Sequence, residues 1–143
     1  MMGNLSAFLA QNAIKIENVK HVVSERFLNE DGKPIAWEIR CITSAEDEAI
    51  RKSCTKRVPV PGKRNQFSQE TDINLYLGKL ASTCTVYPNL NDEDLQNSYH
   101  VMGAEALLKT MLTAGEYADY LAKIQEVCGF DRTLQDEVDE AKN

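Results

Sequence analysis

The sequence predicts an α+β fold, namely a single, mainly α-helical domain with an N-terminal β-hairpin. The chain of 143 residues has the length of one domain and can bury about two-thirds of its unfolded surface. Around Trp37, residues alternate with the period of a strand that has one buried face. After residue 44, apolar residues recur at the three- and four-residue spacing of amphipathic helices.

The N-terminal third predicts one helix and the hairpin. Residues 5–13 predict a short amphipathic helix, which must dock on another surface because a helix of barely two turns is marginal alone. Residues 16–42 predict the β-hairpin, with a turn at residues 29–32 in which Gly32 supplies the positive backbone dihedral. Trp37 is expected to anchor the core, because a lone tryptophan on an alternating strand usually packs inside the protein.

A helix is predicted over residues 44–55. Thr43 stands three residues before Glu46, and Ser44 stands three residues before Asp47. Either pair can form a capping box, in which a hydroxyl and a carboxylate satisfy the free amides at the helix start.

The stretch at residues 56–70 is the long irregular part of the chain. Its prolines exclude a helix, since proline lacks the amide hydrogen and restrains the residue before it. Six basic residues and no acidic residue lie between Arg51 and Arg64. We interpret this stretch as a mobile basic loop, with a small hairpin whose arms are residues 57–60 and 66–67 as the alternative.

Residues 71–128 are predicted to be helical. A helix over residues 71–85 stops before Pro88, and Asn91 can cap a short helix that begins with acidic residues.

The last helix predicted in this part begins at Thr113, which can form a capping box with Glu116, and it ends at Gly129. Residues 130–143 follow as an acidic tail with five acidic and two basic residues.

Composition and motifs argue against several classes of protein. A net charge of −6 and a pI near 4.9 disfavour a protein that wraps nucleic acid, which usually presents a basic surface. The sequence lacks the G-x-S-x-G, H-E-x-x-H and phosphate-loop motifs, so we expect no enzyme and no cofactor. It also has no signal peptide and no apolar run of about 18 residues, which predicts a soluble, intracellular protein without a membrane partner.

The four cysteines lie far apart, with no C-x-x-C pair. The two histidines, His21 and His100, have no companions at the spacing of metal ligands. We therefore interpret Cys41, Cys54, Cys84 and Cys128 as small apolar core residues with free thiols, and we expect no metal site.

What the sequence offers instead is surface for binding. Two apolar helical stripes suit a partner helix that docks with anchors every three to four residues, although both stripes can equally be core. The basic stretch can contact an acidic partner, although it can equally be a solvated run of charge. The candidate partner-binding residues are Leu107, Leu108, Met111, Leu112, Tyr117, Leu121, Lys56, Arg57, Lys63 and Arg64.

A family resemblance runs through nearly the whole chain, over residues 5–143. It is carried by SAFLAQNAIKIENVKHVVSERFLNEDGKPIAW, WEIRCITSAEDEAIRKSCTKRVPVPGKR, YLGKLASTCTVYPNLNDEDLQNSY and GAEALLKTMLTAGEYADYLAKIQEVCGF. These segments resemble the XkdN-like phage tail assembly chaperones, small proteins of Bacillus-type phages and prophages. The family has no catalytic signature to transfer, so the resemblance identifies no functional residues.

The resemblance implies a non-enzymatic protein of the bacterial cytoplasm that binds the tape measure protein during tail assembly. It implies that this protein presents its client to the tail tube protein and is absent from the finished virion. Such families often include a longer frameshifted form, and this chain would be the short one. The alternatives are a minor structural or adaptor protein of the tail and a small nucleic-acid-binding regulator that uses the basic loop.

Overall fold

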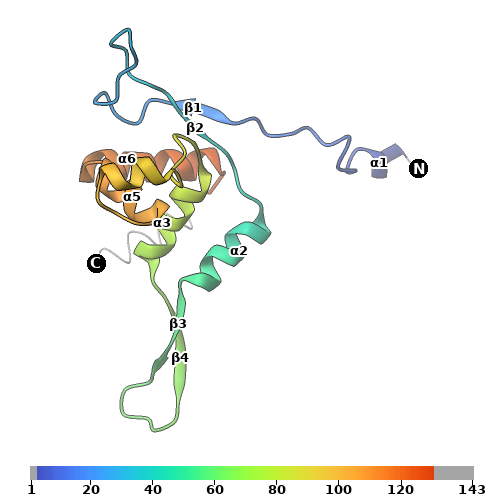
Figure 1. The fold of residues 1–143 in the computed structure, drawn as a ribbon. Coiled ribbons are helices and arrows are strands. Elements are labelled where there is room, and N and C mark those ends of the chain that lie inside the picture. The colour runs from blue at the N-terminus through green and yellow to red at the C-terminus, as the bar shows by residue number, and fades with distance from the viewer. Residues whose placement is uncertain (1–2, 131–143) are drawn as a thin grey trace.

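The computed structural model describes residues 3–130 and confirms the predicted α+β class. Its helical body consists of α3 (Ile73–Cys84), α5 (Ala104–Met111) and α6 (Ala114–Val127), with the short α4 (Glu93–Ser98) between α3 and α5 (Figure 1). The predicted acidic tail, residues 130–143, lies outside the described residues except for its first one.

The sheet of the body has three short antiparallel strands in the order β1 (Val19–His21), β2 (Trp37–Ile39) and β5 (Thr85–Tyr87). The predicted N-terminal hairpin is therefore confirmed, although its strands are only three residues long. Strand β5 was not predicted: the segment directly after α3 turns into a strand and pairs with β2. Such pairing is decided by a strand distant in sequence, which local periodicity does not report.

Helix α2 (Ser44–Ser53) begins with the expected capping box. The amide of Glu46 donates to the Thr43 hydroxyl at 3.2 Å, and the amide of Thr43 donates to the Glu46 carboxylate at 3.0 Å. A second capping box joins Thr113 and Glu116 at the start of α6, again as expected. The cap of α4 is Asp92 rather than Asn91, because it is the Asp92 carboxylate that accepts the amide of Leu95.

Residues 56–70 form a hairpin, so the preferred interpretation as a mobile loop is wrong and the alternative is correct. Strands β3 (Thr55–Pro59) and β4 (Phe67–Thr71) pair antiparallel from Thr55 opposite Thr71 to Pro59 opposite Phe67. The two threonine hydroxyls hydrogen-bond across the pair at 2.9 Å. Pro59 is tolerated because it ends its strand, where a missing amide costs little. The hairpin projects from the body beyond α2 (Figure 1).

The helix predicted over residues 5–13 does not form as such. Only α1 (Gly3–Ser6) is helical, and the following residues make separate turns. The physical reason is that nothing in the described chain covers their apolar side chains, and so short a helix needs such a surface. This segment runs away from the body toward α1 (Figure 1).

The core lies between the sheet and helices α3, α5 and α6. Trp37 is confirmed as its anchor, with 1% of its surface exposed. Its indole meets the Tyr120 ring edge-on, with ring centroids 5.3 Å apart. The other fully enclosed large side chains include Ile39, Tyr76, Leu80, Leu90, Leu107, Leu108 and Ile124.

Candidate partner-binding surfaces

The apolar stripe proposed for a partner is mostly interior. Leu107, Leu108, Met111 and Leu112 are all buried, with 0 to 6% of their surface exposed. The cause is that α5 packs closely on α3, where a Cβ at Gly78 would lie 2.7 Å from Glu105 Cγ. A core stripe and a docking stripe have the same spacing, so the sequence did not separate them. In this conformation these four residues are not accessible to a partner. Replacing Leu108 with aspartate would therefore disrupt the core.

Tyr117 and Leu121, on α6, are half-buried at the edge of the same core. The Tyr117 hydroxyl is buried without a hydrogen-bond partner among the described residues. Burial raises the pKa of this hydroxyl to about 12, and the negative charge of Glu105 adds to the increase. A buried hydroxyl without a partner costs free energy, so Tyr117 contributes to the core through its ring alone.

The predicted basic residues come together on the β3–β4 hairpin. Lys56 and Arg57 lie on β3, Lys63 and Arg64 lie in its connecting turn, and all four are exposed. The Arg57 guanidinium covers the Phe67 ring at 4.0 Å from its centroid. Because the hairpin carries these four basic residues and one acidic residue, it is a positively charged projection on an acidic chain.

Residues 5–18 form an exposed apolar segment, which we call the N-terminal arm. Every residue of the arm is exposed. A soluble domain rarely leaves so many large apolar side chains uncovered without a partner for them. Their exposed fractions are 67% for Leu5, 80% for Phe8, 44% for Leu9, 97% for Ile14 and 76% for Ile16. The amphipathic pattern of residues 5–13 identified Leu5, Phe8 and Leu9, but it did not indicate that they face solvent, and it did not include Ile14 or Ile16.

The base of the arm is held by the sheet. Asn18, its last residue, donates to the Glu38 carboxylate of β2 at 3.1 Å, and β1 follows directly. The end of the arm at Asn18 is therefore attached to the sheet of the body.

Arg26 fixes the long β1–β2 connection on the helices. Its guanidinium donates to the Met111 carbonyl at 2.7 Å and to both carboxylate oxygens of Glu116 at 2.5 and 3.3 Å. The bonds from Arg26 to the carboxylate lower the pKa of Glu116 to about 2, and hydrogen bonds from Ser24 and the amide of Thr113 act in the same direction. The contact ties the end of α5, the start of α6 and the connection into one unit.

Three cysteines that lie far apart in sequence also meet, which sequence spacing did not reveal. Cys41, Cys84 and Cys128 gather where α3 and α6 end, while the buried Cys54 lies at the end of α2. Within residues 3–130, no three histidine, cysteine or acidic residues are arranged to hold a metal ion.

This small α+β body, with its projecting apolar and basic segments, belongs to a known class of phage proteins. The model of the phage XkdN-like tail assembly chaperone proteins matches residues 5–142. The chain therefore belongs to the XkdN-like family of phage tail assembly chaperones.

Two proteins of Bacillus subtilis (strain 168) are similar over nearly their whole length. The phage-like element PBSX protein XkdN and the uncharacterized protein YqbN are each 30% identical over 141 residues, or 98% of this chain. The match covers 94% of XkdN and 93% of YqbN. The crystal structure of YqbN superimposes with a TM-score of 0.74 at 26% identity, covering 88% of this chain and 96% of that chain.

No helix in the described part of the chain is both long and apolar enough to span a membrane.

Proposed function

We propose that this tail assembly chaperone binds the tape measure protein of its phage and keeps it from aggregating until the tail tube forms around it. The observation that carries the proposal is the N-terminal arm, whose large apolar side chains are uncovered. Membership of the chaperone family supports it, because a chaperone of this kind needs apolar surface that is free to meet a client.

The arm suits a helical client. Leu5, Phe8 and Leu9 have the spacing of one helical face, although the free arm forms only turns there. Docking on an apolar client would supply the surface that a short helix needs, so binding and helix formation are expected to occur together. Each large apolar side chain that becomes buried contributes about 1.5–3 kcal/mol before the cost of ordering the arm.

The basic hairpin is expected to add long-range attraction. Its four cations are exposed, so they can attract acidic segments of the client at long range, before either surface loses water. Contacts of this kind raise the association rate and are screened by salt. We expect no nucleic acid, membrane or cofactor to take part.

The proposal is tested by coexpressing the chain with the tape measure protein of the same phage. The client should remain soluble and co-purify with several copies of the chaperone, because one small domain shields only a short part of a long helix. Replacing Phe8 and Ile14 with serine should reduce capture roughly 100-fold or more, since two anchors are lost. The matched control is serine at Met102, which is 91% exposed but lies outside the arm.

A second variant separates charge from apolar contact. Reversing Lys56, Arg57, Lys63 and Arg64 to glutamate should weaken capture at about 50 mM salt and much less at about 500 mM, where exposed charges are screened. If the client is equally insoluble with and without the chaperone, or the serine variant of the arm captures it normally, the proposal is wrong.

The proposal also places the protein in the cytoplasm of the bacterial host and outside the mature virion. Mass spectrometry of purified particles checks this, since stoichiometric copies in the particle would favour the alternative of a minor tail protein.

A further inference from the structure

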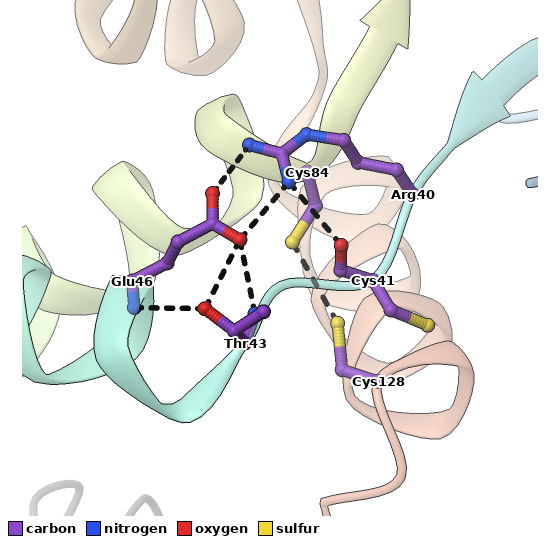
Figure 2. Close-up of polar contacts among 6 residues, drawn as sticks. All are labelled: Arg40, Cys41, Thr43, Glu46, Cys84 and Cys128. Carbon is purple, nitrogen blue, oxygen red and sulfur yellow. Dashed lines mark hydrogen bonds and ion pairs between the residues drawn. The ribbon is translucent and has the colours of Figure 1, made fainter. Parts of the chain in front are cut away.

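Three thiols from three distant parts of the chain form a cluster at one end of the helical body. Cys84 is the last residue of α3, and Cys128 caps the end of α6. Their sulfur atoms lie 3.6 Å apart (Figure 2). Cys41 follows β2, and its thiol donates to the carbonyl of Val127, the neighbour of Cys128, at 3.0 Å.

The surroundings make the thiols of the cluster unequal. The contact with the Cys84 thiol lowers the pKa of Cys128, and the amide of Ile42, the Cys41 thiol and the charge of Arg40 act in the same direction. The same contact, together with burial, raises the pKa of Cys84. Ionisation is therefore favoured at the half-buried Cys128 over the fully buried Cys84.

Arg40 is held beside the cluster by its own contacts. Its guanidinium donates to the carbonyl of Cys41 at 3.2 Å and to the Glu46 carboxylate at 3.0 Å (Figure 2). Glu46 also belongs to the capping box of α2, which holds its carboxylate in place. The position of the Arg40 guanidinium is therefore fixed through Glu46.

Cys128 lies at the surface hollow nearest the cluster, whereas Cys84 is enclosed. Cys128 is half-buried and Cys84 is fully buried. Cys128 borders a surface hollow of about 180 Å³, which Ile42, Thr43, Ser44, Asp47 and Phe130 also line. Cys128 therefore borders a space large enough for hydrogen peroxide, and the Cys84 sulfur lies 3.6 Å from the Cys128 sulfur.

We propose that Cys84 and Cys128 are a reversible redox site, in which a peroxide oxidises Cys128 and Cys84 resolves the product into a disulfide. The Cys128 thiolate attacks one peroxide oxygen, so an S–O bond forms, the O–O bond breaks and hydroxide leaves. The Cys84 sulfur then attacks the sulfenic sulfur, so the S–S bond forms and the S–O bond breaks. The departing hydroxide takes the Cys84 proton and leaves as water. Two thiols lose two electrons, and the peroxide is reduced to two waters.

The closure requires only a small movement. The sulfur atoms must move from 3.6 Å to about 2.05 Å apart. Cys128 lies at the end of its helix, directly before Gly129, whose φ of 76° already departs from the helix. The bond would tie the end of α6 to the end of α3.

The experiment uses the full purified chain and equimolar hydrogen peroxide, followed by intact mass and peptide mapping. We expect a loss of two hydrogens per chain and a peptide pair that joins Cys84 to Cys128, both reversed by dithiothreitol. The melting temperature should rise by roughly 5–15 °C on oxidation, because the bond closes a loop in the unfolded chain. Cys54→Ala is the matched control and should oxidise like the original chain, whereas Cys128→Ala should not form the pair.

A second measurement does not depend on the disulfide. The midpoint of the pH dependence of Cys128 alkylation by iodoacetamide should lie below that of a free cysteine, and it should shift to higher pH in Cys84→Ala, which lacks the contact between the thiols. Disulfides that form only between chains or that include Cys54, or thiols that stay reduced while free cysteine is oxidised, would overturn the proposal.

Discussion

Replacing Trp37 with alanine tests the prediction that the body is organised around the central strand of the sheet. Trp37 lies on β2, which pairs with β1 on one side and β5 on the other. Only 1% of its surface is exposed. Its ring contacts Tyr120 edge-on and lies 6.3 Å from the Phe27 ring, centroid to centroid. The side chain thus connects the sheet, the β1–β2 connection and α6.

The expected loss of stability follows from these contacts. A buried tryptophan removes about 200 Å² from water, which at about 25 cal/mol per Å² amounts to about 5 kcal/mol. Alanine retains its Cβ and the cavity relaxes in part, whereas the lost edge-on ring pair adds to the cost. We expect Trp37→Ala to lower the free energy of unfolding by about 3–5 kcal/mol, a large part of the stability of a small domain.

The assay is urea unfolding followed by circular dichroism, because Trp37 is the only tryptophan and fluorescence would be lost with it. Phe8→Ala is the matched control, since Phe8 is an aromatic residue with 80% of its surface exposed. It should change stability by less than about 0.5 kcal/mol. A loss below about 1 kcal/mol for Trp37→Ala would refute the packing described here.

Three further predictions concern charge, an unpaired hydroxyl and metal. The folded pKa of Glu116 is about 2 and its ordinary value is 4.5, so its stabilising contact with Arg26 is complete above pH 4.5 and is lost as the pH falls toward 2. Glu116→Gln should therefore flatten the dependence of melting temperature on pH across that window, and an unchanged slope would contradict it. Tyr117→Phe should leave stability unchanged or raise it by up to about 1 kcal/mol in urea unfolding, because the hydroxyl it removes has no partner among the described residues. A chelator should leave the melting temperature unchanged, and a stoichiometric zinc released with loss of the fold would show the thiols to be ligands.

The two capping boxes were the most predictable helix starts of the fold, whereas the cap of α4 and the helix at residues 5–13 were not predicted correctly. The capping boxes at Thr43 and Thr113 are formed by residues three positions apart, so the whole interaction is visible in the sequence. The burial of Trp37 was also predictable, because alternation along a strand marks its buried face. Strand β5 and the β3–β4 hairpin were harder, since a strand is defined by its partner.

The candidate site was less predictable for a related reason. Apolar periodicity predicts which side chains are more stable when buried, but it does not predict which element covers them. On α5 the cover is α3, so Leu107 and Leu108 are core. On the N-terminal arm no described part of the chain covers Phe8 or Ile14, so the same kind of signal marks a surface.

The thiol cluster depends on a contact between segments that are distant in sequence. Cys84 and Cys128 are 44 residues apart, and their meeting depends on how the ends of α3 and α6 pack. Spacing within the sequence cannot report such a contact, and the same sequence reasoning that treated the four thiols alike therefore missed a difference between them. Only Cys54 remains apart from the cluster as a buried thiol. If peroxide oxidises Cys128 and leaves Cys54 reduced, then the packing around each thiol, and not the composition of the chain, decides which cysteine reacts.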